Sequence, residues 1–261
     1  MTDSDLWIRR FQPGPPSGPR LVCFPYAGGA ASYFHPLATS LRQTAGVLAV
    51  QYPGRQERRS EETLRDLHTL ADRVAAALSP YRDRPLVFFG HSMGAVVAHE
   101  VALRLAEDGE GPVELFASGR RAPSRHRDDK VRLLDDDGLV RELKSLAGTA
   151  PALLDDEEIL QMVLPSIRGD YWAVETYRHR PGTMLSCPVT VLTGDRDTRV
   201  SLDDARAWRE HTTGRFALET FSGGHFFIND HTEAIAGLLR RRLSELAPRP
   251  SAAAHAVRPD R

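Results

Sequence analysis

The sequence predicts an α/β fold, with a mostly parallel central sheet flanked by helices and a helical lid insertion. Short apolar runs bounded by glycine and proline recur along the chain, as is typical of strands buried on both faces of a sheet. Longer stretches with apolar residues at helical spacing lie between these runs. Such alternation of strands and helices indicates a doubly wound sheet.

Six apolar runs are predicted strands, and most of them end in a glycine-containing or proline-containing loop. They are residues 21–24, 47–50, 86–89, 113–117, 189–192 and 216–221. A short segment at residues 7–11 precedes them, and the loop that follows it, at 12–20, is rich in proline and glycine.

Three helices are predicted between or after these strands. From Leu64 onward, apolar residues recur at 67, 70, 71, 74 and 78, which gives one apolar face. Residues 95–106 are apolar nearly all round, as expected of a helix buried beside a sheet, and the helix stops at Asp108-Gly109. Residues 235–243 form the last amphipathic helix.

One segment of about 70 residues, between Gly119 and Pro188, contains no clear strand. Because a structureless loop of that length is improbable, its helical patterns at 139–146 and 157–164 predict a lid over about residues 122–180. We expect this lid to cover the site, with Tyr171 and Trp172 either lining an acyl pocket or joining lid to core. Residues 1–247 are the predicted single domain, and 248–261 a disordered tail.

Composition excludes several classes of function. The formal net charge of −1 gives no electrostatic case for nucleic acid or an anionic membrane as partner. No apolar run is long enough for a transmembrane helix and the acidic N-terminus lacks a secretory signal, so we expect a cytoplasmic monomer. Cys23 and Cys187 lie in or beside apolar runs and are predicted reduced core thiols. Since no Cys/His cluster has ligand spacing, we expect no metal and no bound cofactor.

The sequence Gly-His-Ser-Met-Gly at residues 90–94 matches the nucleophile elbow Gly-x-Ser-x-Gly. The motif follows an apolar strand and opens a long apolar helix, which is the setting that the elbow requires. It therefore predicts an α/β-hydrolase fold with Ser92 as nucleophile. The alternative is a glycine-rich strand-to-helix turn with an idle serine.

Two aspartates compete for the role of the acid that orients the base. Asp195 and Asp197 both follow the strand at 189–192, where this fold places its acid. Asp197 is favoured because it stands three residues after Gly194 and three before Val200. We expect one of the two to bond backbone amides in the turn.

The predicted base is His225, which follows two glycines directly after the last strand. His91 adjoins Ser92 in sequence, but an elbow points adjacent side chains apart, so His91 is not expected to be the base. An oxyanion formed at the reacting carbonyl needs backbone donors. We expect these from Met93, the residue after the nucleophile, and from Ala27 in the loop at 25–29.

Together these motifs resemble a type II thioesterase, a stand-alone editing enzyme of polyketide and nonribosomal peptide biosynthesis. The resemblance runs from about Trp7 to Leu246 and rests on residues 24–29, 51–55, 90–94, 194–197 and 223–227, with Asp170, Tyr171 and Tyr177 in the lid. It implies hydrolysis of acyl thioesters on the phosphopantetheine arm of acyl or peptidyl carrier proteins, which clears misprimed or stalled units. It also implies the same nucleophile, acid, base and oxyanion donors.

Three other functions remain open at this point: an esterase acting on small free esters, a chain-releasing thioesterase, and a hydrolase-like binding protein without turnover. The role of Arg55 is also open, since it could bind the arm or pair with a nearby acid. Two groups of arginines follow strand ends and could form a basic docking surface for acidic carrier proteins or a merely solvated surface. They are Arg55, Arg58 and Arg59, and Arg120, Arg121 and Arg125.

Overall fold

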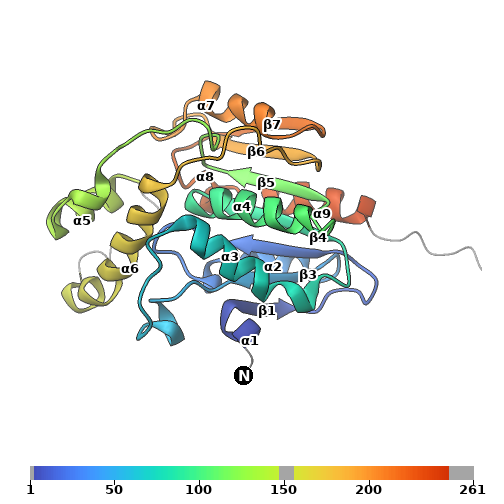
Figure 1. Ribbon diagram of the computed structural model, residues 1–261, viewed down its shortest axis with the longest axis horizontal. Coiled ribbons are helices and arrows are strands. Elements are labelled where there is room, and N and C mark those ends of the chain that lie inside the picture. The colour runs from blue at the N-terminus through green and yellow to red at the C-terminus, as the bar shows by residue number, and fades with distance from the viewer. Residues whose placement is uncertain (1–2, 147–155, 247–261) are drawn as a thin grey trace, which may run out of the picture.

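The computed structural model describes residues 3–146 and 156–246 and contains one seven-stranded sheet (Figure 1). The strand order is β1-β3-β2-β4-β5-β6-β7, and every neighbouring pair is parallel except β1 with β3. The predicted fold class, a mostly parallel sheet flanked by helices, is confirmed. The strands are β1 (Ile8–Gln12), β2 (Arg20–Phe24), β3 (Gly46–Val50), β4 (Leu86–His91), β5 (Glu114–Ser118), β6 (Val189–Gly194) and β7 (Phe216–Phe221).

The six predicted strands correspond to β2 to β7, whereas β1 was not predicted as a strand. Its residues belong to the short segment before the first apolar run, which also contains the end of helix α1 (Asp3–Trp7). β1 lies at the antiparallel edge of the sheet and carries Arg9 and Arg10, so it is only partly buried. A half-exposed edge strand lacks the continuous apolar run that marks a central one.

Helices cover both faces of the sheet and give it two separate cores. Residues of α3 and α4 pack with Val22 and Phe24 of β2 on one face, and residues of α2 and α9 pack with Leu21 and Cys23 on the other. This alternation follows from the two-residue repeat of a strand. Besides α1, the α-helices described outside the lid are α2 (His35–Leu41), α3 (Leu67–Ala77), α4 (Met93–Glu107), α7 (Leu202–Arg206), α8 (Phe227–Asp230) and α9 (Thr232–Leu246).

Two helices, α5 (Asp136–Ser145) and α6 (Glu157–Thr176), lie beyond one end of the sheet and form the lid described below (Figure 1). α5 begins at an aspartate cap, since the Asp135 carboxylate accepts a bond from Gly138 N at 2.8 Å. α6 continues well past the predicted end at Leu164, through Pro165, because its later turns pack on the core. Three parts of the sequence prediction lie outside the described residues. They are residues 147–155 of the insertion, residue 247 at the end of the domain, and the tail at 248–261.

The lid helices have a small apolar cluster of their own. It consists of Val131, Leu139, Leu143, Leu164 and Ile167.

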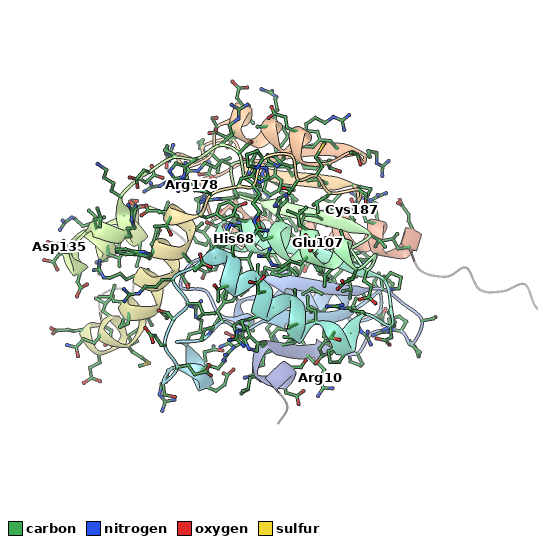
Figure 2. The ribbon with its side chains drawn as sticks, in the orientation of Figure 1. Arg10, His68, Glu107, Asp135, Arg178 and Cys187 are labelled. Carbon is green, nitrogen blue, oxygen red and sulfur yellow. The ribbon has the colours of Figure 1, made fainter. Side chains whose placement is uncertain are left out.

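Asp135, before α5, and Cys187, before β6, lie on opposite sides of the molecule in Figure 2. Both cysteines are free, as predicted, and burial raises the pKa of the Cys187 thiol to about 11. No helix among residues 3–146 and 156–246 is long and apolar enough to cross a membrane.

Candidate active site

The turn from β4 into α4 holds Ser92 in a conformation that a side chain rarely adopts, with φ 53° and ψ −119°. The two flanking glycines are required by close packing. A Cβ on Gly90 would lie 2.3 Å from the carbonyl oxygen of Gly94, and a Cβ on Gly94 would lie 2.0 Å from that of Phe24. The sequence Gly-x-Ser-x-Gly is thus the steric condition for this turn, which presents the serine hydroxyl beyond the end of β4.

His225 lies between Ser92 and Asp197 and contacts both. Its Nε2 is 3.0 Å from Ser92 Oγ, and its Nδ1 is 2.9 Å from Asp197 Oδ2. Because a carboxylate only accepts hydrogen bonds, Nδ1 carries the proton and Nε2 is free to accept from the serine hydroxyl. The side chains of His225 and Asp197 are 7% and 0% exposed, so water competes little for these bonds. The structure therefore brings the three predicted residues into one hydrogen-bonded row.

The two competing aspartates have different partners. Asp197 bonds the base with one oxygen and accepts from the Arg199 amide with the other, at 2.8 Å. Asp195 is about half exposed and accepts from the Gly223 amide at 2.8 Å. Asp197 is thus the aspartate that lies at His225, while Asp195 ties the β6 loop to the glycine turn before His225.

His91 is fully buried beneath the site and turns away from the nucleophile. Its Nδ1 is 3.0 Å from Ser118 Oγ, and its ring packs against that of His225 with centroids 5.4 Å apart. Burial, and secondarily the nearby His225, lower the pKa of His91 well below its ordinary value. A neutral imidazole bound to Ser118 fits a structural role.

The two predicted oxyanion donors come from neighbouring strands. Met93 is the first residue of α4, so its amide has no acceptor within the helix and lies at the positive end of the helix dipole. Ala27 lies in a turn after β2, which is closed by a 2.8 Å bond from Gly29 N to the carbonyl oxygen of Tyr26. β2 and β4 are adjacent at the point where the chain switches sides of the sheet, which is where open α/β sheets bind ligands. The donor roles themselves stay predictions.

Residues 19–243 match the model of a known family, described as the thioesterase domain. The chain belongs to the thioesterase domain family. It is 52% identical over 229 residues to a probable cadicidin biosynthesis thioesterase of Streptomyces griseus. The aligned residues cover 88% of this chain but only 63% of that protein. It is 50% identical over 236 residues to the thioesterase PikA5 of Streptomyces venezuelae, across 89% of this chain and 84% of that one.

A solved structure is also similar throughout. The type II thioesterase BorB from the borrelidin biosynthetic cluster superposes with a TM-score of 0.87 at 49% identity, over 93% of this chain and 100% of that one. The predicted resemblance to type II thioesterases is therefore confirmed, and with it the prediction of a hydrolase that acts on thioesters.

A cleft of about 330 Å³ lies between the lid helices of this thioesterase and the turn at residues 26–29. We call this turn the oxyanion turn, after the predicted role of Ala27. The walls of the cleft are mostly apolar, with Leu143 of α5 and Ile159, Val163 and Ile167 of α6 on the lid side, and the Tyr26–Gly29 turn, Tyr33 and Phe226 on the core side. Of the two alternatives predicted for Tyr171 and Trp172, the structure does not place either residue in the wall of this cleft. Tyr171 packs on the small lid cluster, and the ring of Trp172, 38% exposed, faces two arginines instead.

Only part of the two predicted arginine groups lies at the surface, so neither the docking nor the solvated interpretation applies to all six side chains. Three of the six side chains are buried in ion pairs with acids from other segments or the next turn. These pairs are Arg55–Asp170 at 2.8 Å, Arg58–Glu61 at 2.6 Å and Arg121–Asp129 at 2.9 Å. Only Arg59 and Arg125 of the six are exposed. Their position after strand ends was right, but the sequence gives no sign of which acid folds over each guanidinium.

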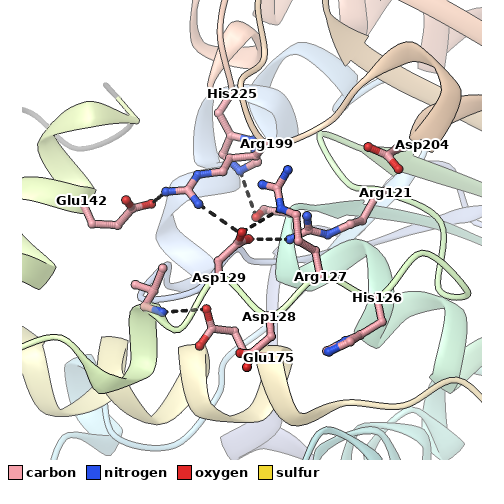
Figure 3. Close-up of polar contacts among 12 residues, drawn as sticks. Arg121, His126, Arg127, Asp128, Asp129, Glu142, Glu175, Arg199, Asp204 and His225 are labelled. Carbon is pink, nitrogen blue, oxygen red and sulfur yellow. Dashed lines mark hydrogen bonds and ion pairs between the residues drawn. The ribbon is translucent and has the colours of Figure 1, made fainter.

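Arg199, two residues after Asp197, ties the acid loop to the lid (Figure 3). Its guanidinium forms an ion pair with Glu142 of α5 and lies 3.6 Å from Asp129. Asp129 in turn contacts Arg121 and Arg127 at 2.9 and 2.7 Å. Nothing in the sequence pointed to this network, since its members are far apart along the chain and have no motif.

Three histidines, one of them in α4, cluster where the chain leaves the lid. The rings of His99, His179 and His211 lie with centroids 4.6 to 5.9 Å apart. Burial lowers the pKa of His99 to about 3 and that of His211 to about 4, so both are neutral at pH 7. Across residues 3–146 and 156–246, no group of side chains is placed to hold a metal ion.

Proposed function

We propose that this thioesterase hydrolyses acyl thioesters on the phosphopantetheine arm of acyl or peptidyl carrier proteins, through an acyl-enzyme on Ser92. The observation that carries the proposal is the hydrogen-bonded row Ser92–His225–Asp197, buried in a fold of the thioesterase family. Nucleophile, base and orienting acid in this order are the arrangement that activates a serine hydroxyl.

The geometry supports a two-step reaction. Ser92 Oγ attacks the thioester carbonyl carbon while its proton moves to His225 Nε2, and Asp197 stabilises the imidazolium. The carbon–sulfur bond then breaks, and the leaving sulfur takes the proton from His225. A water molecule, deprotonated by His225, attacks the acyl-enzyme, and the proton returns to Ser92 Oγ as the free acid departs.

During both steps the carbonyl oxygen becomes negative and needs preorganised donors. The amides of Met93 and Ala27 are the proposed donors, because they follow adjacent parallel strands at the end where Ser92 stands. The apolar cleft of about 330 Å³ beside this turn is the proposed acyl site, with room for a short or medium chain.

An editing role, clearing misprimed or stalled units, is supported by the similarity to BorB, a type II thioesterase from the borrelidin biosynthetic cluster. Similarity to part of a large synthase keeps chain release as the competing role. The chain is 38% identical to a segment covering 16% of the phenyloxazoline synthase MbtB of Mycobacterium tuberculosis.

The test compares one acyl group on three carriers: a carrier protein, N-acetylcysteamine and a simple alcohol. We expect kcat/KM to be highest on the carrier protein, and short acyl groups to be released faster than a full-length product. Ser92→Ala should lower kcat by about 10⁴ or more and abolish labelling by a fluorophosphonate, while the acyl-carrier protein still binds.

Two outcomes would contradict the proposal. If Ser92→Ala keeps more than about a tenth of the activity, Ser92 is not the nucleophile. If the alcohol ester is hydrolysed as well as the carrier-bound thioester, the chain is a general esterase. Faster release of the full-length product than of short acyl groups would favour the chain-releasing role instead.

A further inference from the structure

A buried ion pair joins the lid to the segment after β3. Arg55 Nη2 is 2.8 Å from Asp170 Oδ1 of α6, and the two side chains are only 5% and 4% exposed. Desolvation of two buried charges offsets most of their attraction, so such a pair is a weak source of net stability. What the directional bonds of such a pair do provide is fixed orientation of its surroundings.

Both members of the pair also bond the backbone of the oxyanion turn. The second oxygen of Asp170 accepts from the Gly28 amide at 2.7 Å, and Arg55 Nη1 donates to the Gly29 carbonyl at 3.1 Å. Gly28 has φ +78°, as the third position of a type II turn requires. Its amide belongs to the central peptide of this turn, so the Asp170 carboxylate holds that peptide in one of its two orientations. Ala27 provides the carbonyl of this peptide, and its own amide, the proposed donor, belongs to the preceding peptide, which is joined to this one at the Ala27 Cα.

Arg55 is itself fixed from below. Its guanidinium lies over the ring of Tyr52, 5.2 Å from the centroid, and Tyr52 Oη donates to the Pro25 carbonyl at 3.3 Å. The segment after β3 thus contacts the start of the oxyanion turn through Tyr52 and its end through Arg55. The contact to its centre comes from α6, through Asp170.

We propose that Asp170 and Arg55 are positioning residues of the oxyanion hole, so that the hole is complete only when lid helix α6 is seated on the turn. The proposal rests on the proposed serine mechanism and adds to it a coupling between lid and chemistry. The packing of Ile167 supports it, since this α6 side chain lies 2.5 Å from where a Cβ on Gly28 would be. If α6 moved away, the turn would lose both the hydrogen bond to Asp170 and the contact with Ile167.

The test uses Asp170→Asn and Arg55→Lys in the full chain. Asp170→Asn keeps the size of the side chain but removes the charge that Arg55 requires. Arg55→Lys keeps the charge but cannot bond Asp170 and the Gly29 carbonyl as a rigid fork. Because removal of a whole oxyanion donor costs about 10²–10³ in kcat, we expect a misplaced donor to cost about 10- to 100-fold.

The decisive measurement is binding of a trifluoromethyl ketone analogue of the thioester. Ser92 adds to its carbonyl carbon, the proton moves to His225, and the carbonyl oxygen becomes an oxyanion in the hole. We expect the affinity for this analogue to fall by the same factor as kcat in both variants. The affinity for intact acyl-carrier protein, measured in a Ser92→Ala background, should stay within about threefold, since ground-state binding does not use the hole.

Arg58→Gln is the matched control. Arg58 is a buried arginine of the same segment, 3% exposed, but it bonds Glu61 and the Gln51 carbonyl instead of the oxyanion turn. Its loss should lower Tm while leaving analogue affinity unchanged. Far-UV circular dichroism and Tm identify any variant that fails to fold, and Arg55→Lys, which keeps the charge balance, provides the test if Asp170→Asn unfolds.

The proposal is overturned if folded variants bind the ketone as tightly as the wild type, whatever their Tm. A wild type that neither hydrolyses thioesters nor adds the ketone would instead contradict the serine mechanism, and the positioning role would fall with it. The two failures are thus told apart by the behaviour of the wild type alone.

Discussion

The two sides of Ser92 are built in different ways. On the base side, His225 and Asp197 stand in loops that follow β7 and β6, and they bond each other directly. On the oxyanion side, the turn follows β2, but its Gly28 amide bonds Asp170, which belongs to lid helix α6. The base side is therefore complete within the sheet, whereas the oxyanion side depends on a segment inserted elsewhere in the chain.

Close backbone packing explains why the base side needs no lid. The Arg196 amide donates to the Gly223 carbonyl at 2.9 Å, and a Cβ on Gly194 would lie 2.4 Å from the Gly224 carbonyl oxygen. Two loops on adjacent strands that pack this closely hold their side chains in register without further support. Reactivity of the base is then expected to be a property of the core, and stabilisation of the oxyanion a property of core and lid together.

The largest effect that tests this difference concerns the two aspartates. Asp197→Asn should lower kcat by about 10⁴, because the amide removes the charge that stabilises the His225 imidazolium and favours the wrong tautomer. Asp195→Asn should cost less than about tenfold, since an amide oxygen can still accept from the Gly223 amide. Steady-state kinetics on an acyl-carrier protein checks the ranking, and the reverse order would move the acid to Asp195.

The second test introduces a methyl group between lid and turn. Gly28→Ala places a Cβ against Ile167 and forces a residue with a side chain to φ +78°, so we expect kcat to fall by about 10- to 100-fold. Gly109→Ala is the control, since Gly109 has φ +74° but nothing within 4 Å of its Cβ position. Strain alone costs about 1 kcal/mol of folding stability at either site.

Equal activities of the two alanine variants, measured well below their melting temperatures, would contradict the idea that the lid acts on the turn. A loss confined to Gly28→Ala would support it. Restoring activity to this variant with Ile167→Ala, which removes both the Cγ1 and the Cδ1 atom of the contact, would locate the effect at the α6 interface.

The same contrast explains what the sequence could predict. The six predicted strands and the meeting of Ser92, His225 and Asp197 were predictable because each depends on local signals: an apolar run, a glycine-flanked serine, a spacing within a loop. Asp170 was visible only as part of a resemblance, without a role. Its function depends on a contact with Gly28 that spans 142 residues, and no local rule connects two such positions.

The open alternatives at the lid have the same origin. The sequence left Tyr171 and Trp172 either lining the pocket or joining lid to core, because the direction of a helical side chain depends on how the helix is seated. The aliphatic residues Ile159, Val163 and Ile167 recur at helical spacing and face the cleft instead. That periodicity was present in the sequence, although only the position of the oxyanion turn reveals which face of α6 it meets.

A third prediction uses acid to disturb both sides of the site together. His99 and His211 are buried with pKa values of about 3 and about 4, below the ordinary value of 6.5. Between pH 6.5 and these lowered pKa values, the unfolded chain therefore binds more protons than the folded one. The stability that the two groups contribute is complete above pH 6.5 and is lost as the pH falls towards 4, by at most about 1.4 kcal/mol per pH unit for each histidine.

Urea unfolding at several pH values, followed by circular dichroism, measures this slope. His99→Phe should flatten it, because the ring that replaces the imidazole does not titrate. Activity lost through this route should track the unfolded fraction and leave the relative rates of Gly28→Ala and the wild type unchanged. A His99→Phe variant with an unchanged slope would contradict the assignment of that histidine.

The smallest expected effect concerns a contact between lid helix α5 and the base side, the ion pair Arg199–Glu142. Its side chains are 24% and 14% exposed, and partly exposed pairs of this kind contribute about 0.2–1 kcal/mol, which salt reduces. The Arg199 amide that bonds Asp197 belongs to the backbone, so Arg199→Gln leaves the acid in place. We therefore expect kcat to stay within about threefold of the wild type, with a small loss of Tm at low salt.

At about 1 M salt, where the screening length is about 3 Å, the Tm difference should shrink towards that of Arg206→Gln, which removes an exposed pair with Asp203. A loss of kcat above tenfold would mean that α5 controls the acid loop, and both sides of Ser92 would then depend on the lid.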